Sequence, residues 1–300
     1  MGTYRILLYY KFVKIENPDG FAKEHLDFCC SLELLGRIII APEGINGTLS
    51  GTKQQTDAYI AMMRLDHRFR DMEFKIDESE HHVFRKLSVK ARKEIVTFGL
   101  DTIDPNDLTG KYIEPKEFYR AMQEPDAIII DARNDYEYDM GHFQKAIRPN
   151  VEAFKEFPEW VRKNLSEIKD KKILTYCTGG IRCEKFSAFL IQEGYKEVYQ
   201  LHGGIINYSK DPEVKGRLFD GKCYVFDERI AVRTNFTEEE TIISKCHYCR
   251  VTTDRFVNCA HLDCHVRFFL CRSCEKTHRR SCSKACEDAA HHEYSENAVN

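Results

Sequence analysis

The six-residue segment Cys177-Thr-Gly-Gly-Ile-Arg182 starts with a thiol and ends with a guanidinium. A loop of this length can turn its backbone N–H groups inward and form a small nest for negative charge. Its two glycines permit the tight curvature. These donors and the arginine charge favour a thiolate or a persulfide over a neutral thiol. We therefore predict that Cys177 and Arg182 are catalytic. The rest of the loop is expected to bind an anion: Thr178, Gly179, Gly180 and Ile181.

The elements around this loop are predicted to form an α/β sheet. Residues 171–177 (KKILTYC) form a buried strand that ends at the thiol, and residues 183–193 form the helix that follows. The apolar run at 127–131 (AIIID) is typical of a strand buried in a parallel sheet. A third strand is expected at 197–200, with further helices at 115–122 and 158–168. The loop thus lies between a strand's carboxyl end and a helix's amino end, where open α/β sheets place their sites.

The other cysteines of this part of the chain have alternative roles. Free cysteine is often simply buried, and that is our interpretation of Cys29, Cys30 and Cys223. Cys183, directly after Arg182, either resolves an oxidised or persulfidated Cys177 or packs beneath the loop. We favour packing.

Eight of the thirteen cysteines lie near the carboxyl end, with the spacing C-x2-C-x9-C-x4-C-x6-C-x2-C-x7-C-x3-C. Eight thiolates suffice for two tetrahedral zinc ions, which would be structural because closed four-ligand sites leave no position for substrate. Iron–sulfur clusters and disulfides fit the spacing and a reducing compartment less well. Spacing leaves interleaved and sequential pairing open. The predicted ligands are Cys246, Cys249, Cys259, Cys264, Cys271, Cys274, Cys282 and Cys286.

The amino-terminal part reads as strand, helix, two strands, helix and strand, the ferredoxin-like order shared with acylphosphatases. The strands are expected at 6–13, 37–40, 47–50 and 72–76 and the helices at 20–35 and 53–65. Gly44, Gly47 and Gly51 are interpreted as turn residues.

A basic stretch follows, and it is either a solvated strand-like connector or a contact to an RNA backbone. A Pro-, Asp- and Gly-containing linker covers 101–110. The candidate RNA-binding residues of the basic stretch are Arg85, Lys86, Lys90, Arg92 and Lys93.

Composition bounds the function classes. With 45 basic and 48 acidic residues the net charge is −3, so no global basic signal indicates nucleic acid and any such surface must be local. We expect no DNA partner. No secretory signal or membrane-length apolar run is visible, which predicts a cytoplasmic protein without a membrane partner. The polar stretch 289–300 is expected to be disordered.

A second motif lies upstream of the loop, in DARNDYEYDMGHFQKAI. It resembles the rhodanese element Asp-x-Arg…Glu…Gly-His-Ile-x-Gly-Ala, and LHGGI at 201–205 completes the pattern. The resemblance implies a rhodanese-like domain over 110–220, with Asp131 and Arg133 supporting the site. Rhodanese-type loops have six residues, whereas those of the related phosphatases have seven. The six-residue loop of this chain therefore counts against a phosphatase. The matching residues of the motif are Asp131, Arg133, Glu137, Gly141, His142 and Ala146.

Nearly the whole chain is similar to the bacterial tRNA uridine hydroxylase family. The similarity is carried by YCTGGIRCEKFSAFL, VYQLHGGIINY and FRKLSVKARKEIV. It implies three units: a ferredoxin-like α+β domain over 1–98, the rhodanese-like α/β domain with a parallel sheet, and a zinc module over 240–288. It also implies oxygen-dependent formation of 5-hydroxyuridine at the wobble position of tRNA, with Cys177 as the functional cysteine. Molecular oxygen would be a co-substrate, and no organic cofactor is evident.

Two other function classes remain open from the sequence. The first is a rhodanese-type sulfurtransferase that carries a cysteine persulfide to another acceptor, which brisk Cys177-dependent thiosulfate–cyanide turnover would favour. The second is an adaptor whose zinc module binds protein. RNA binding that requires the intact module would weigh against it.

Overall fold

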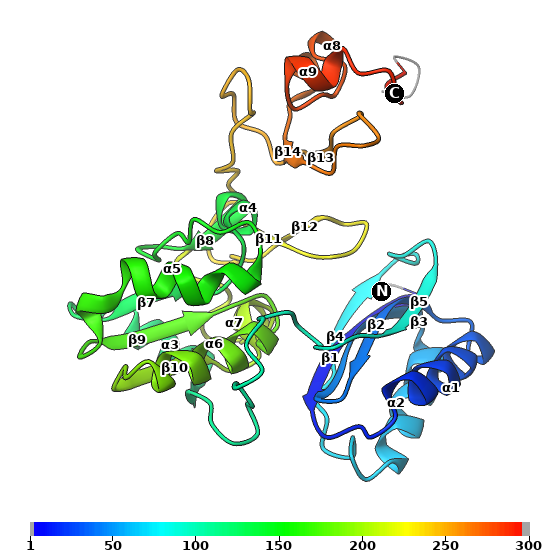
Figure 1. The fold of residues 1–300 in the computed structure, drawn as a ribbon, viewed down its shortest axis with the longest axis vertical. Helices are drawn as coiled ribbons and strands as arrows, with labels where there is room; N and C mark the ends of the chain where they lie inside the picture. The colour runs from blue at the N-terminus through cyan, green and yellow to red at the C-terminus, as the bar shows by residue number, and fades with distance from the viewer. Residues whose placement is uncertain (1–2, 296–300) are drawn as a thin grey trace.

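The amino-terminal unit is a five-stranded sheet with two helices on one face (Figure 1). The computed structural model describes residues 3–295. Strand order is β4-β1-β3-β2-β5, and the first four strands reproduce the ferredoxin-like order. Its elements are β1 (Tyr4–Phe12), α1 (Pro18–Ser31), β2 (Leu35–Ala41), β3 (Gly44–Thr52), α2 (Lys53–Leu65), β4 (Lys75–Ser79) and β5 (Leu87–Ala91).

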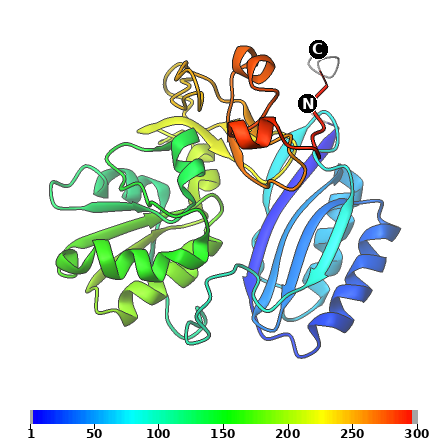
Figure 2. The same cartoon turned by 45° about the horizontal axis from the view of Figure 1, so that its top comes forward.

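Alternation along β1 explains how this sheet can pack on both faces. Leu7 and Tyr9 point into the helix-covered core, where both are fully buried. Leu8 and Tyr10 therefore point to the opposite face. That second face is turned toward the central unit (Figure 2), so its apolar residues also have a partner.

Two expectations for this unit were wrong. Gly47 and Gly51 lie within strand β3 instead of in turns, whereas Gly44 is the first residue of β3 and follows the two-residue turn that joins it to β2. Gly47 is required by packing, because a Cβ there would lie 2.3 Å from the hydroxyl oxygen of Tyr9. The last expected strand forms slightly later than 72–76, as β4. Part of the basic stretch is β5, a regular edge strand that pairs in parallel with β2.

The central unit contains a four-stranded parallel sheet of order β6-β10-β9-β7. The parallel sheet was predicted, whereas its fourth strand, β6, was not. Apolar cores lie on both of its faces, which explains the continuous apolar runs in its strands. The expected helix at 158–168 is the α-helix α5 followed by a short 3-10 turn at Ser166–Ile168. The elements are β6 (Lys111–Ile113), α3 (Pro115–Ala121), β7 (Ile128–Asp131), α4 (Asp135–Met140), β8 (Gly141–Phe143), α5 (Phe157–Asn164), β9 (Lys172–Tyr176), α6 (Ile181–Gln192), β10 (Glu197–Leu201) and α7 (Gly204–Lys210).

A small antiparallel sheet connects this unit to the cysteine-rich module. Strand β11 (Phe219–Tyr224) pairs with β8 on one side and with β12 (Ala231–Arg233) on the other. The module itself has a two-stranded hairpin, β13 (Phe256–Asn258) and β14 (Arg267–Phe269), and two short helices, α8 (Arg272–Thr277) and α9 (Lys284–Glu287).

Part of the carboxyl-terminal segment that follows α9 contacts the module. His292 bridges His261, and the backbone N–H of Glu293 donates to the carbonyl of Ala260 at 3.0 Å. Residues 291 to 293 thus contact the module. The rest of the expected tail, residues 296–300, lies outside the described residues.

Helix α6 joins the first two units through buried charge. Lys185 is 1% exposed, and its ammonium lies 2.8 Å from a carboxylate oxygen of Glu43 and 2.7 Å from one of Glu94. The carboxylate of neighbouring Glu184 accepts hydrogen bonds from the hydroxyls of Tyr10 and Tyr112. These contacts join α6 to β1, to the β2–β3 turn and to the segment after β5. They thus fix how the two sheets face each other.

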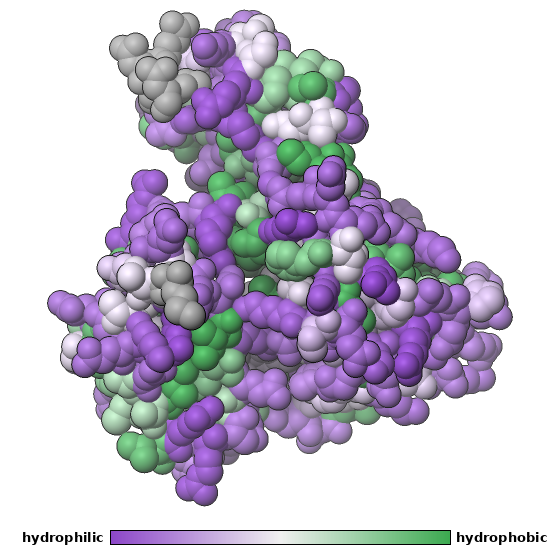
Figure 3. All heavy atoms as spheres, turned by 180° about the vertical axis from the view of Figure 1, so that it is seen from behind, coloured by the Kyte–Doolittle hydropathy of each residue, from purple (hydrophilic) through white to green (hydrophobic). Residues whose placement is uncertain are grey.

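The face of the molecule seen from behind is largely hydrophilic, with hydrophobic residues gathered in patches (Figure 3). Across residues 3–295, every helix is too short or too polar to cross a bilayer.

We predict that Lys185→Ala destabilises the protein strongly. The change leaves the partly buried carboxylates of Glu43 and Glu94 without their counter-charge. Removing one partner of a fully buried pair costs roughly 3–5 kcal/mol, which is the upper bound here. The midpoint of urea denaturation should fall. The variant Lys185→Met/Glu43→Gln/Glu94→Gln, which leaves no unpaired charge, should recover part of the loss. Lys196→Ala removes an exposed ion pair with Asp170 and serves as the matched control. Equal midpoints for Lys185→Ala and Lys196→Ala would contradict this account.

Candidate functional site

The loop from Cys177 to Ile181 wraps its backbone around the Cys177 sulfur. Cys177 follows the last residue of β9, and α6 begins at Ile181. The backbone N–H of Gly180 donates to Sγ of Cys177 at 3.1 Å. Gly180 adopts φ +105°, a conformation that favours glycine. The nest expected from the sequence is therefore formed, with the thiol as the group it binds.

This environment favours the thiolate. Burial alone would raise the pKa of Cys177, but it is outweighed by a hydrogen bond from the Cys183 thiol, the charge of Arg182 and the backbone N–H groups of residues 182 and 183. The net effect lowers the Cys177 pKa to about 6. Burial, the hydrogen bond given to Cys177 and the charge of that thiolate raise the pKa of Cys183. At neutral pH the pair is thus one thiolate and one thiol donor.

Arg182 is held by a carboxylate and is not free to bind a ligand with both of its terminal nitrogens. Its two Nη atoms donate to the two carboxylate oxygens of Glu137 at 2.6 and 2.9 Å, and Nη2 also lies 3.3 Å from the Thr178 hydroxyl. Glu137 is fully buried. Burial by itself raises the Glu137 pKa, but the Arg182 charge and hydrogen bonds lower it below its usual value. The glutamate of the upstream motif thereby orients the arginine of the loop.

Asp131 and Arg133 form a second buried ion pair behind the loop. The guanidinium donates to both Asp131 oxygens, at 2.9 and 2.6 Å, and to the carbonyl of Gly141 at 2.7 Å. The Tyr176 hydroxyl also donates to Asp131, at 2.7 Å. The pair ties the end of β7 to the residue before Cys177. It supports the loop without lining the space in front of the thiol.

The LHGGI motif fixes the loop from its other side. Gly204 approaches so closely that a Cβ would lie 2.5 Å from the carbonyl oxygen of Cys177 and 2.7 Å from that of Thr178. The next backbone N–H, that of Ile205, donates to the Cys177 carbonyl at 2.9 Å. A glycine is therefore required where β10 leads into α7, for close backbone contact.

Cys177 is fully buried and forms part of the wall of a cavity of about 460 Å³ between the central unit and the open face of the amino-terminal sheet. The loop residues Thr178, Gly179, Ile181 and Arg182 line it, whereas Gly180, Cys183, Asp131 and Arg133 lie outside its wall. Apart from Arg92, the sequence reasoning missed the lining residues that come from other elements. They include Leu8, Tyr10, Arg37, Asn46, Phe84, Lys155 and Phe226.

A signal for part of this wall is present in the sequence. The run ILLYY in β1 lacks the polar residues that a strand with one solvated face would show at alternate positions. It therefore indicates a second packed face. Phe226 gives no such signal, because it lies in a short connection between β11 and β12 and is half exposed.

The five basic candidates do not share one place. Arg92 lines the cavity, and Lys90 pairs in register with Ile39, another lining residue, which puts both on the same sheet face. Arg85, Lys86 and Lys93 are exposed outside this cavity, with Arg85 in an ion pair with Glu228.

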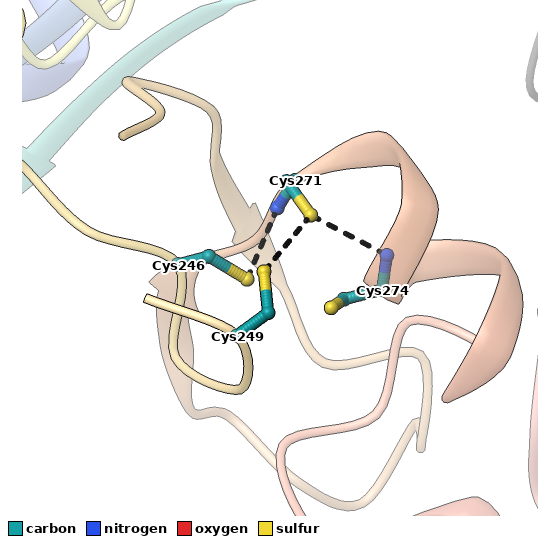
Figure 4. Close-up of side chains that lie close together, drawn as sticks. All are labelled: Cys246, Cys249, Cys271 and Cys274. Atoms are coloured by element: carbon teal, nitrogen blue, oxygen red, sulfur yellow. Dashed lines mark hydrogen bonds between the residues drawn. The ribbon is translucent and has the colours of Figure 1, made fainter. Parts of the chain in front are cut away.

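The eight predicted metal ligands form two groups of four. One group is Cys246, Cys249, Cys271 and Cys274 (Figure 4), and the other is Cys259, Cys264, Cys282 and Cys286. The ligand atoms within each group lie within 4.8 Å of one another. The pairing is thus interleaved, which spacing had left open.

The sulfur geometry fits a tetrahedral metal ion. Zinc–sulfur bonds of about 2.3 Å imply sulfur–sulfur distances of about 3.8 Å around a tetrahedron. The Sγ atoms of Cys249 and Cys271 are 3.7 Å apart, and those of Cys264 and Cys282 are also 3.7 Å apart. The nearby histidines are not part of either group, and His278 stacks on Tyr248 instead.

Known protein families match the same three parts of the chain. Residues 4–95 match a UPF0176 acylphosphatase-like domain, residues 114–211 a rhodanese-like domain and residues 220–287 a rhodanese carboxyl-terminal region. The tRNA uridine(34) hydroxylase of Bacillus licheniformis is 58% identical over 95% of this chain and 88% of its own length. The chain belongs to the tRNA uridine(34) hydroxylase family.

Other members of the hydroxylase family align equally fully. The protein of Bacillus mycoides is 55% identical over 94% of this chain and 89% of its own length, and that of Bacillus cereus strain G9842 is 54% identical over 97% and 91%. Among solved structures, a rhodanese-like domain from Anabaena covers 49% of this chain and 100% of its own length, with 16% identity and a TM-score of 0.32. The resemblance and the fold class expected from the sequence are confirmed.

We predict that iodoacetamide alkylates Cys177 with an inflection near pH 6, whereas an ordinary thiol has a pKa of about 8.5. The rate falls below this pH because the thiolate is protonated. Peptide-resolved mass spectrometry measures each cysteine separately. In Glu137→Gln/Arg182→Gln, which replaces the buried ion pair with a neutral pair, the inflection should move to higher pH. Arg148→Gln, an exposed charge change, is the control. An inflection near 8.5 in the unaltered protein would contradict the prediction.

Proposed function

We propose that this protein hydroxylates carbon 5 of the wobble uridine of tRNA in the cytoplasm, with Cys177 as the catalytic nucleophile. The observation that carries the proposal is the placement of a stabilised thiolate at the wall of a cavity of about 460 Å³. That volume lies in the range of pockets that hold small ligands. The names of the relatives, tRNA uridine(34) hydroxylases, supply the substrate.

The cavity suits a base taken out of its stack. Enzymes that act on a base bind it in a pocket between aromatic or apolar side chains and read its polar edge. Phe84, Phe226 and Ile95 supply apolar walls here, while Asn46 has a side-chain oxygen that is not engaged by its hydrogen bond to the Ile95 carbonyl. Arg37 and Arg92 add positive charge on the sheet side. A uridine with its phosphates matches this combination.

The chemistry we propose is conjugate addition. The Cys177 thiolate forms a bond to carbon 6, and the electron pair of the 5,6 double bond moves to the oxygen on carbon 4. Carbon 5 then attacks one oxygen atom of the peroxide formed when dioxygen takes up two electrons, and the O–O bond breaks. Carbon 5 loses its proton as Cys177 is expelled and the double bond re-forms. One oxygen atom of dioxygen enters the base. The other leaves as water, with two electrons and two protons from a soluble thiol reductant. Loop amides and Arg182 stabilise negative charge near the site.

The proposal is tested by nucleoside mass spectrometry of tRNA from cells that lack this protein. Complementation with the unaltered gene should restore 5-hydroxyuridine derivatives, and Cys177→Ala should leave them at background. Cys30→Ala, which removes an exposed cysteine far from the cavity, should restore them fully.

Full restoration by Cys177→Ala would remove the proposed role of Cys177. Failure of the unaltered protein, together with brisk Cys177-dependent thiosulfate–cyanide turnover, would favour persulfide transfer instead. That alternative is supported by the nest around the Cys177 sulfur, which suits a persulfide as well.

We further propose that each cysteine group holds one structural zinc ion. Four thiolates in a closed tetrahedral arrangement leave no open coordination position, and in a short segment such ions supply much of the folding free energy. Native mass spectrometry should therefore count two zinc ions per chain.

The interleaved pairing makes a sharp prediction for cysteine variants. Cys246→Ser/Cys249→Ser and Cys271→Ser/Cys274→Ser should each lose one ion, and the combined fourfold variant should lose no more than one. Sequential pairing predicts loss of both ions from the fourfold variant. Cys30→Ser is the control and should keep two.

A further inference from the structure

A second hollow, of about 550 Å³, lies beside the cysteine-rich module and is lined by five arginines. Two glutamates, Glu275 and Glu293, are the acidic residues of its wall, so positive charge is in excess. One arginine comes from the amino-terminal unit and four come from the module. They are Arg85, Arg255, Arg267, Arg272 and Arg280.

This arginine-lined hollow shares a wall with the Cys177 cavity. Phe84 lines the cavity, and the next residue, Arg85, lines the hollow. Likewise Phe226 lines the cavity and Ile230 the hollow, at the two ends of one short connection. The two segments are joined, because the backbone N–H of Glu228 donates to the carbonyl of Val83 at 3.0 Å. An RNA strand whose base enters the cavity would therefore pass the hollow within a few nucleotides.

Four of the arginines, Arg85, Arg255, Arg267 and Arg280, make hydrogen bonds that hold them in place and that use only some of their donors. Arg267 lies over the ring of Phe256, 4.7 Å from its centroid, and Arg255 is fixed by Glu275 and the carbonyl of Leu270. A guanidinium has five N–H donors. Within the described part of the chain, Arg85, Arg267 and Arg280 each use one of them in a side-chain hydrogen bond. The Nε atom of Arg280 is buried without a partner.

We propose that this hollow binds the backbone phosphates of the tRNA nucleotides that flank the target uridine. Phosphates accept paired hydrogen bonds from guanidinium groups, and such contacts position RNA without reading its sequence. The inference rests on the proposed function, since it assumes that tRNA is the substrate. It assigns to the module a direct contact with substrate, continuous with the catalytic cavity.

The test is tRNA binding by Arg85→Ala/Arg272→Ala, measured by fluorescence anisotropy over a range of salt concentrations. Full-length zinc-loaded protein and an unmodified tRNA transcript with uridine at the wobble position are used. Loss of two phosphate contacts should weaken binding roughly tenfold near 0.1 M salt and reduce the salt slope by about 1.5. The kcat at saturating tRNA should stay unchanged, because the lost contact is equal in ground and transition states.

Two matched variants make the result specific. Arg64→Ala/Arg70→Ala also removes two exposed arginines, but from α2 and the segment after it, and should bind tRNA normally. Arg85→Lys/Arg272→Lys keeps the charge and should keep most of the salt slope. Zinc content and the Cys177 alkylation profile should be the same in all variants, which excludes unfolding as the cause.

Equal affinity and equal salt slope for the Arg85/Arg272 and Arg64/Arg70 alanine variants would overturn the inference and indicate another occupant, such as an acidic protein. If the unaltered protein hydroxylates tRNA in that experiment, the proposed function still stands. If the unaltered protein neither binds nor hydroxylates tRNA, both proposals fail together.

Discussion

The buried charges of α6 determine the rest of the architecture, because they hold the amino-terminal sheet against the central unit. The cavity before Cys177 has walls from both, so it depends on that docking. Lys185 contacts two carboxylates of the first unit, and Glu184 accepts hydrogen bonds from Tyr10 and Tyr112. Burying charge is favourable only when each group is paired and hydrogen-bonded. The orientation of the two sheets is thereby restricted, since any shift would leave a charge unpaired.

One turn of helix thus serves both chemistry and assembly. Arg182 contributes positive charge to the loop, Cys183 gives a hydrogen bond to the thiolate, and Glu184 and Lys185 face the other unit. Arg182 is paired with Glu137, and its effect on the Cys177 pKa comes second to the hydrogen bond from Cys183. Stabilisation of the Cys177 thiolate therefore depends heavily on short-range donors, the Cys183 thiol and the backbone N–H groups. Such donors are fixed by the fold and need no reorganisation when charge develops.

Sequence patterns predicted the local features well and the long-range contacts poorly. The Cys177 loop, the parallel sheet and the eight metal ligands each follow from residues close together in the chain. The pairing of the cysteines could not be predicted, because loops of these lengths are compatible with both interleaved and sequential pairing. Gly47 was wrongly interpreted as a turn residue. Glycine is required there because the ring of Tyr9, on the neighbouring strand β1, leaves no room for a Cβ. Phe226 and Lys185 were missed for the same reason: their partners come from other units.

The module illustrates how a short segment can present charge rigidly. Fewer than about 70 residues rarely bury enough apolar surface for a stable core, and metal ions commonly supply the difference. Here the interleaved cysteines enclose the β13–β14 hairpin, and cysteine side chains make up much of the cluster around Phe268 and Leu270. Arg255 and Arg267 lie next to that hairpin or within it. Metal ions held by the two cysteine groups would therefore fix the positions of these arginines, so that like charges remain close together despite their mutual repulsion.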